Sequence, residues 1–361
     1  MPLPLYVAIT NHGFGHATRM AAVVAEIQQR RPDIPITITT TAPRWLLECY
    51  LTQAVTYRPL AFDIGVVQQD SVTMDKAATL AKLKQIQATQ EETIAREATF
   101  LQQSGAGLLL ADIPPLAGPI AKAAGIPCWM ASNFGWDFIY REWAQSGKSE
   151  FGAIADWISG CFSQCDRLFR LPFHEPMAAF PNIEDTGLTG GRPRWSVAEL
   201  HQRFPLNPDA EKTVLLTFGG LGLAQIPYAG LSRFDNWQFI TFDRTAPELP
   251  NVLKVTDPQY RPVDMMPLCD FIVSKPGYGT FAEACLQDVP IMSITRDGFA
   301  EAPVLIEGIQ QVAHHHIISP EALMQGDWAF LEEPLSPPVE DRPVAKDGNG
   351  AIAQAVIEAI A

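Results

Sequence analysis

The sequence contains little positive charge. Its 361 residues include 26 Lys and Arg against 40 Asp and Glu, which gives a formal net charge of -14 at pH 7. A surface of this charge repels nucleic-acid phosphates and anionic lipid, so we do not expect nucleic acid as a partner. A local basic patch that holds a small anion is still compatible with this balance, because net charge describes the whole surface and not one cleft.

The sequence also lacks any segment typical of secretion or membrane insertion. The first residues, MPLPLYVAITNHGFGH, place no basic region before an apolar run, so we expect no secretory signal. The most apolar long stretch, residues 105–131, is interrupted by Asp112, two prolines and Lys122, and favours a strand, a loop and a helix over a membrane span. We therefore expect a soluble, cytoplasmic protein.

Metal ligands at a recognisable spacing are missing. The six cysteines are scattered, and the close pair Cys161 and Cys165 has no second pair or nearby His to complete a zinc site. In the run from His314 to His316, neighbouring side chains of a strand point to opposite faces and cannot converge on one ion. The sequence therefore predicts reduced thiols and no metal centre.

Short apolar runs alternate with amphipathic helical patterns along the whole chain. The strand candidates lie at residues 6–10, 36–40, 108–111, 126–130, 213–218, 238–242, 252–255, 271–273 and 291–294. This order is typical of parallel α/β sheets with crossover helices. We therefore predict an α/β protein built from two consecutive α/β domains.

Proline and glycine gather in residues 171–194, which predicts the domain boundary there. We place the first domain at residues 1–186 and the second at residues 187–361. Ile352, Val356 and Ile360 recur at four-residue spacing, so the chain should end in a packed helix. One option is that this last helix packs back on the first domain.

Four loops that follow predicted strands carry most of the candidate site residues. In an open α/β sheet, ligands bind outside the carboxyl ends of the strands. The first loop reads Asn11-His12-Gly13-Phe14-Gly15-His16. Gly13 and Gly15 allow close backbone approach, and the following helix offers free N–H groups to an anion. His12 and His16 are suited to proton transfer near neutral pH.

Two other interpretations of this first loop are open. One is a dinucleotide site, but Thr18 replaces the third glycine of the fingerprint, and the second strand ends in three threonines with no acid for a ribose. The other is a tight turn whose histidines merely cap the helix. Two His and two Gly within six residues favour a binding or catalytic site.

The second and third loops are rich in glycine. The second contains Gly219 and Gly220, which suggests backbone contact with a ligand. In the third, residues 274–284, three positions open a predicted helix where N–H groups and the helix dipole bind a diphosphate. These three positions are Gly277, Gly279 and Thr280. Lys275 supplies a cation, and Glu283 stands one turn into the helix, where a carboxylate accepts from ribose hydroxyls.

The third loop also fits a purely structural alternative. Thr280 and Glu283 have the spacing of a capping box, in which the threonine caps the helix and the glutamate answers three residues on. In the fourth loop, Asp297 and Glu301 either grip sugar hydroxyls or belong to a solvated helix start.

An aromatic and polar cluster follows the strand at residues 126–130. It contains Asn133, Trp136 and Asp137. Aromatic faces stack on sugar rings, so an acceptor pocket is one interpretation, and a helix core is the other.

The chain resembles the GT-B glycosyltransferases, the group that includes the N-acetylglucosaminyltransferase of peptidoglycan synthesis. It resembles in particular the glycosyltransferase-like N-terminal region of plant arabinose kinases and its stand-alone bacterial relatives. Residues 12–19, 112–115, 132–137 and 275–284 carry this resemblance. It implies two Rossmann-like domains whose parallel sheets face a central cleft. The second domain is then expected to bind a nucleotide-sugar, usually with uridine.

Carried over by motif, the resemblance assigns roles to the loops. Diphosphate is expected at Gly277, Gly279 and Thr280, ribose at Glu283, and the phosphate edge at Gly219 and Gly220, with Asp297 and Glu301 near the donor sugar. His16 is expected to face the reacting centre. Lys275 stands where plant glucosyltransferases have a His, and also where retaining enzymes have a Glu eight residues before the ribose acid, so inversion is favoured.

These features together predict an inverting glycosyltransferase that uses a nucleotide-sugar, with UDP favoured, as co-substrate. No Asp-x-Asp occurs, which agrees with a metal-independent reaction that needs no cofactor. His16 is the expected base, Asp112 orients or replaces it, and His12 is the alternate base. Asp112 also fits a turn before two prolines. Two alternatives are a non-catalytic sugar-nucleotide-binding module and a sugar-nucleotide epimerase. The sequence names neither the donor sugar, nor the acceptor, nor the oligomeric state.

Overall fold

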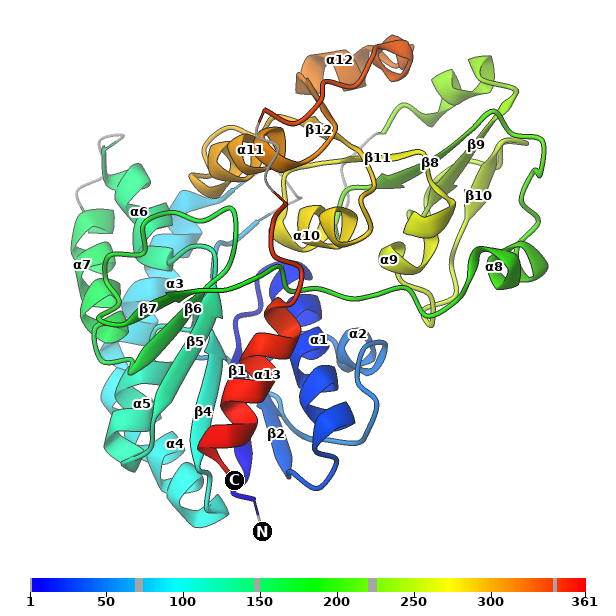
Figure 1. The fold of residues 1–361 in the computed structure, drawn as a ribbon. Helices are drawn as coiled ribbons and strands as arrows, with labels where there is room; N and C mark the ends of the chain where they lie inside the picture. Colours follow the sequence, from blue (N-terminus) through cyan, green and yellow to red (C-terminus); the bar gives the residue numbers. More distant parts are fainter. Residues whose placement is uncertain (1, 69–73, 146–149, 220–225, 340–342) are drawn as a thin grey trace.

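The fold consists of two lobes, each built around a parallel sheet with helices on both sides (Figure 1). The computed structural model describes residues 2–68, 74–145, 150–219, 226–339 and 343–361. The seven-stranded sheet of the first lobe has the order β3-β2-β1-β4-β5-β6-β7, and the six-stranded sheet of the second has the order β10-β9-β8-β11-β12-β13. The predicted α/β class is therefore confirmed.

The strands of the first sheet are β1 (Leu5–Ile9), β2 (Ile36–Thr39), β3 (Thr56–Arg58), β4 (Leu108–Asp112), β5 (Cys128–Ser132), β6 (Arg167–Arg170) and β7 (Ile183–Asp185). The strands of the second are β8 (Lys212–Thr217), β9 (Trp237–Thr241), β10 (Val252–Lys254), β11 (Phe271–Ser274), β12 (Ile291–Ile294) and β13 (His315–Ile318). The central strands β1, β4 and β11 are buried at every position, as expected for parallel strands that are covered on both faces.

The helices of the first lobe are α1 (Gly15–Arg30), α2 (Arg44–Glu48), α3 (Lys76–Ala88), α4 (Gln90–Ser104), α5 (Ala117–Ala124), α6 (Trp136–Gln145) and α7 (Glu150–Phe162). Those that follow in the chain are α8 (Val197–Arg203), α9 (Pro262–Met265), α10 (Tyr278–Leu286), α11 (Glu301–Val312), α12 (Pro320–Gln325) and α13 (Gly348–Ala359). Short 3-10 turns lie at Tyr228–Arg233, Met266–Leu268 and Ala329–Glu332.

Each sheet changes winding direction between its two central strands. In the first sheet the change falls between β1 and β4, and in the second between β8 and β11. The crevice outside the carboxyl ends of such a strand pair is where ligands bind in this type of sheet. The first-loop histidines follow β1, and Asp112 ends β4. Gly219 and Lys275 follow β8 and β11, so the topology gathers the candidate loops at two crevices.

The segment that joins the two sheets follows β7, which ends at Asp185, and the division after residue 186 stays a prediction. The chain returns to the first lobe at its end, where α13 packs against α1 (Figure 1). The Leu3 N–H donates to the carbonyl of Ile360 at 2.9 Å, which holds the two chain ends together. Ile352 and Val356 are fully buried in a core cluster that also includes residues of α1.

The described ranges contain no helix that is both long and apolar enough to cross a bilayer. No group of three or more His, Cys, Asp or Glu in those ranges is arranged to hold a metal ion, and His315 and His316 lie on β13.

The packing of α13 on α1 makes a stability prediction. Ile352→Ala should lower the free energy of unfolding by about 2–5 kcal/mol, because it removes a fully buried side chain and leaves a cavity. The exposed neighbour Gln354 provides a control, since Gln354→Ala should change the free energy by only about 0.5 kcal/mol. Urea titration followed by circular dichroism measures both. Equal effects would show that α13 does not contribute to the core.

Candidate active site

The two glycine loops of the two lobes meet at the N-termini of α1 and α10. A β-carbon built on Gly279 would lie 3.3 Å from Cα of Gly15, so the two backbones are in direct contact. Both helix N-termini carry partial positive charge from unpaired N–H groups. Bringing two such ends together is electrostatically unfavourable unless an anion is bound beside them. The close approach therefore favours an anion site where the lobes meet.

A cavity of about 880 Å³ opens beside this contact, and residues of both lobes line it. A volume of this size is sufficient for a nucleotide-sugar-sized ligand. The sequence-predicted site residues that line it are His12, Gly13, Gly15, His16, Gly219, Lys275, Gly277, Gly279, Thr280, Glu283 and Glu301. Gly220 lies outside the described residues. Asp112, Asn133, Trp136, Asp137 and Asp297 are described but are not part of the cavity lining.

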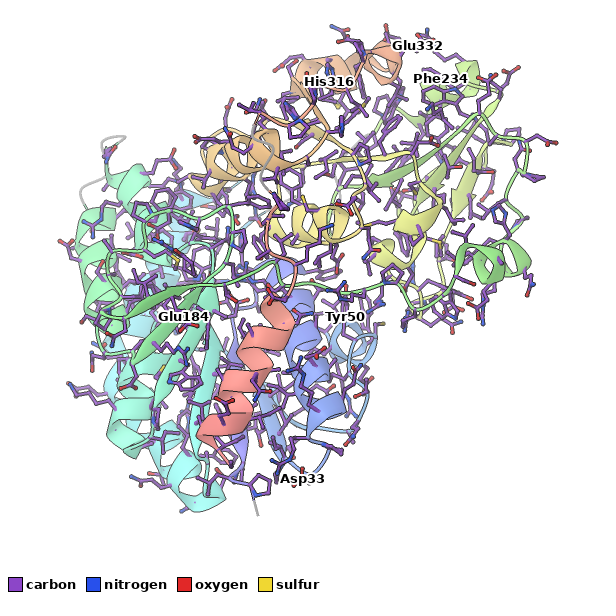
Figure 2. The ribbon with its side chains drawn as sticks, viewed as in Figure 1. Asp33, Tyr50, Glu184, Phe234, His316 and Glu332 are labelled. Atoms are coloured by element: carbon purple, nitrogen blue, oxygen red, sulfur yellow. The ribbon has the colours of Figure 1, made fainter. Side chains whose placement is uncertain are left out.

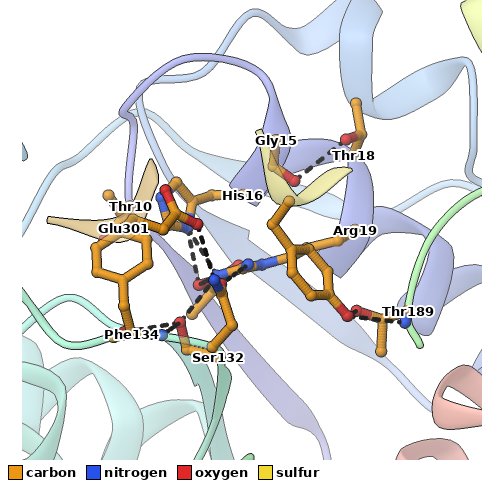
Figure 3. Close-up of polar contacts among 12 residues, drawn as sticks. Thr10, Gly15, His16, Thr18, Arg19, Ser132, Phe134, Thr189 and Glu301 are labelled. Atoms are coloured by element: carbon orange, nitrogen blue, oxygen red, sulfur yellow. Dashed lines mark hydrogen bonds and ion pairs between the residues drawn. The ribbon is translucent and has the colours of Figure 1, made fainter. Parts of the chain in front are cut away.

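His16, labelled in Figure 3, lines this cavity and pairs with Asp112, which lies behind the lining. His16 lies in the first turn of α1, and its Nδ1 is 2.9 Å from Oδ1 of Asp112, the last residue of β4. The carboxylate is fully buried, whereas the imidazole is 5% exposed and lines the cavity. The pair thus has the arrangement of a base whose orientation is fixed by a buried carboxylate.

Arg19, which lies one turn further along α1, binds the same carboxylate with two N–H groups. Its Nε donates to Oδ2 of Asp112 at 2.6 Å, and its Nη2 donates to Oδ1 at 2.6 Å. Burial alone would raise the pKa of Asp112, but the charge of Arg19, followed by that of His16, lowers it overall. Asp112 is therefore an ionised carboxylate rather than a turn residue.

Arg19 also connects the two lobes. Its Nη1 donates to Oδ1 of Asn133 at 2.7 Å, and Nδ2 of Asn133 donates to Oε1 of Glu301 at 2.8 Å. Its guanidinium lies 4.9 Å from the ring centroid of Tyr278 at the start of α10. Figure 3 shows this network from Thr189 through Arg19 to Glu301. Arg19 belongs to the motif at residues 12–19 but is not among the site residues predicted from the sequence.

Five residues were predicted on the acceptor side, and of these Asn133, Trp136 and Asp137 have mainly internal contacts, whereas Gly13 and Gly15 line the main cavity. Asn133 is completely buried between Arg19 and Glu301. Trp136 is 1% exposed, and its ring centroid is 5.1 Å from that of His12. Asp137 accepts a hydrogen bond from Ser159 at 2.9 Å and so connects α6 to α7. The helix-core interpretation describes Trp136 in this structure, and the acceptor assignment of the three residues stays a prediction.

His12 is held as a neutral ring. Burial, followed by the charges of His16, Arg296 and Lys275, lowers its pKa well below the usual value. Its Nδ1 accepts a hydrogen bond from the Val66 N–H at 3.2 Å, so its proton belongs on Nε2. In this tautomer His12 presents a donor and not a base, which favours His16 for proton abstraction.

The Lys275 side chain lies beside Gly219 and Gly277, which belong to the two glycine loops of the second lobe. Two features favour glycine at position 219. A β-carbon there would lie 3.0 Å from Cε of Lys275, and the residue has a φ of +79°, which residues other than glycine rarely adopt. Burial, followed by the charge of Arg296, lowers the pKa of Lys275 to about 8, while Glu301 acts in the opposite direction. The lysine is thus a half-buried cation near the N-terminus of α10.

Glu283 has a different environment from the one that a capping box provides. Gly277 is the N-cap of α10, so Thr280 lies inside the helix and the capping-box interpretation is wrong. Oε1 of Glu283 instead accepts from the Tyr50 hydroxyl at 3.1 Å and from the Gly191 N–H at 3.0 Å. Burial raises the pKa of Glu283 to about 7.

Asp297 lies apart from the main cavity. It is exposed and lines a neighbouring hollow of about 410 Å³ between α6 and α11, together with Glu142 and Glu307. Arg296 lines both spaces, and its guanidinium lies 4.3 Å from the ring centroid of Phe299. Of the two acids predicted near a donor sugar, Glu301 is the one that reaches the main cavity.

Comparison with solved structures identifies the fold. The glycosyltransferase of kitacinnamycin matches with a TM-score of 0.60 and 15% identity, over 99% of this chain and 93% of the other. Phytolacca americana UGT2 complexed with UDP-2fluoro-glucose and pterostilbene matches with a TM-score of 0.61 and 13% identity, over 99% and 94%. The calicheamicin glycosyltransferase CalG4 matches with a TM-score of 0.59 and 15% identity, over 100% and 93%.

The chain has the GT-B glycosyltransferase fold. No family model matches its sequence. Among curated proteins, L-arabinokinase of Arabidopsis thaliana is 30% identical over 339 residues. That alignment covers 91% of this chain but 32% of the kinase, so this GT-B chain spans about a third of the relative's length. The predicted resemblance to GT-B proteins and to a region of arabinose kinases is confirmed.

The Arg19 network makes a stability prediction for this GT-B chain. Arg19→Ala should lower the free energy of unfolding by about 3–5 kcal/mol, because it leaves the buried Asp112 carboxylate without its main counter-charge. The exposed pair of Arg141 with Asp156 provides the control, and Arg141→Ala should cost less than about 1 kcal/mol. Urea titration of both variants compares them. A loss in Arg19→Ala no larger than in the control would contradict the central role of Arg19.

Proposed function

We propose that this protein is an inverting, metal-independent glycosyltransferase that uses a nucleotide-sugar donor, with UDP favoured, and a small-molecule hydroxyl acceptor. The observation that carries the proposal is that His16, paired with the buried Asp112, lines the same cavity as the Lys275 loop. A base oriented by a carboxylate and a cationic helix N-terminus are the two parts that such a transfer needs.

The donor is assigned to the second lobe. The N–H groups at Gly277, Gly279 and Thr280 bind the diphosphate, and Lys275 supplies positive charge. Glu283 accepts from ribose hydroxyls, and Glu301 directs its carboxylate toward hydroxyls of the donor sugar. The complex of Phytolacca americana UGT2 with UDP-2fluoro-glucose, which has this fold, supports a uridine nucleotide.

The reaction is a displacement at the anomeric carbon. The mechanism requires the His16 tautomer whose Nδ1 carries the proton and donates to Oδ1 of Asp112, 2.9 Å away, which leaves Nε2 with a lone pair. Nη2 of Arg19 lies 3.0 Å from the same Nδ1 and in this tautomer donates to the Asp112 carboxylate instead. Nε2 takes the proton of the acceptor hydroxyl. The oxygen of that hydroxyl attacks the anomeric carbon of the donor sugar from the face opposite the diphosphate. The bond between that carbon and the diphosphate oxygen breaks, and Asp112 stabilises the imidazolium that forms.

The departing diphosphate gains negative charge in this step. Lys275 and the N-terminus of α10 stabilise that charge without a metal ion. The absence of an Asp-x-Asp pair from the sequence supports the same assignment, because such a pair is the usual ligand set for a diphosphate-bound cation.

Replacement of the base tests the proposed reaction. His16→Ala should reduce UDP release from a panel of UDP-sugars by about 100-fold or more, while UDP affinity stays within about twofold. The exposed His201 provides the control, since His201→Ala should leave both quantities unchanged. Turnover that survives in His16→Ala would exclude His16 as the base. Donor binding without turnover by the natural protein would favour a binding module, and a changed sugar without acceptor would favour an epimerase.

The pKa of Glu283 predicts how donor affinity depends on pH. Because its pKa is about 7, most of this carboxyl is protonated at about pH 6 and ionised at about pH 8. If the ionised form binds the ribose, the ionised fraction of Glu283 raises UDP affinity about tenfold over this range, and the loss of about half of the Lys275 charge by pH 8 reduces the net rise to about fivefold. Calorimetry at several pH values measures the rise. Glu283→Gln should remove it and leave only the titration of Lys275 and of the phosphate itself, so a rise of equal size in that variant would contradict the assignment.

A further inference from the structure

Tyr50 of the first lobe reaches the acid that is assigned to the ribose in the second lobe. It follows α2 and is labelled in Figure 2 on the side of the first lobe that borders the second. Its hydroxyl donates to Oε1 of Glu283 at 3.1 Å, and both side chains line the main cavity. Tyr50 itself is 8% exposed.

Two neighbours, Arg261 and Gly191, fix the position of the Tyr50 ring. The guanidinium of Arg261 lies 4.5 Å from its ring centroid, and Arg261 is in turn held by two hydrogen bonds to the buried Asp264. A β-carbon on Gly191 would lie 2.6 Å from the Tyr50 ring and 2.9 Å from Oε1 of Glu283. The Tyr50 site is therefore built from both lobes and requires the absence of a side chain at Gly191.

Two hydrogen bonds already occupy the acceptor sites of Oε1 of Glu283. A carboxylate oxygen offers about two lone-pair sites, and Oε1 of Glu283 already accepts from the Tyr50 hydroxyl and from the Gly191 N–H. The backbone N–H is fixed by the chain, whereas the Tyr50 hydroxyl is carried by a side chain. When two vicinal ribose hydroxyls bind both oxygens of the carboxylate, Oε2 accepts from one of them directly, and the one that binds Oε1 has to replace the tyrosine.

We propose that the Tyr50 hydroxyl occupies the place of a ribose hydroxyl on Glu283, so that Tyr50 sets both the affinity and the ribose selectivity of the donor site. The inference rests on the proposed nucleotide site and deepens it. A nucleoside diphosphate exchanges one hydrogen bond to Glu283 for another when it binds, and it gains less than it would at an open carboxylate. Ligands without ribose hydroxyls bind without this exchange.

Tyr50→Phe tests the inference because it removes the hydroxyl and keeps the ring beneath Arg261. The probes are UDP, 2′,3′-dideoxy-UDP and inorganic pyrophosphate, titrated by calorimetry at about pH 7.5, where most of Glu283 is ionised and most of Lys275 still carries its charge. UDP affinity should rise about three- to tenfold in Tyr50→Phe. Affinity for the dideoxy nucleotide and for pyrophosphate should stay unchanged.

Tyr57→Phe is the matched control, since Tyr57 lies on β3 and does not belong to the lining of the main cavity. It should bind all three probes as the natural protein does. Unchanged or weaker UDP binding by Tyr50→Phe would overturn the inference, and so would an equal gain for UDP and pyrophosphate. In either case UDP binding by the natural protein would leave the proposed function standing. If neither protein bound any nucleotide, both proposals would fall.

Discussion

The buried ion pair of Arg19 with Asp112 is the interaction on which the rest of the site depends. Both side chains are almost completely removed from solvent, and a buried charge is tolerated only where its partners satisfy it. Arg19 also donates hydrogen bonds to Ser132 and Asn133 at the end of β5, and its guanidinium lies beside Tyr278 of the other lobe. The same carboxylate orients His16, so one electrostatic requirement fixes the base and the approach of the two lobes.

The second constraint is the contact of two helix N-termini. Although the chain has a net charge of -14, the partial positive charges of two helix N-termini and the charge of Lys275 come together where α1 meets α10. Glycine at positions 15 and 279 permits the backbones to touch. Neither lobe alone presents both the base and the anion site, so the proposed chemistry belongs to the interface between them.

The sequence predicted the parts that local rules determine. Apolar runs gave the central strands, and the rule that ligands bind beyond strand ends selected His16, Lys275 and Glu283 before their contacts were known. It missed β3, β6, β7 and β13, because each of these short strands contains charged, histidine or other polar residues and so lacks the continuous apolar run of the predicted strands. Arg19 was not predicted as a site residue, because its hydrogen-bond partners lie about a hundred residues away in the sequence. Helical spacing also does not tell which face of α6 is buried, and this left the roles of Trp136 and Asp137 open.

The measurement that tests the central claim most directly is calorimetric titration of the protein with UDP, GDP and a panel of UDP-sugars, beside a Glu283→Ala variant. The account predicts that UDP and at least one UDP-sugar bind, that GDP binds more weakly, and that binding is lost in the variant because the ribose then has no acceptor. If no nucleotide binds, or if the variant binds UDP as the natural protein does, the cavity between the lobes is not a nucleotide-sugar site and the proposed role of His16 fails with it.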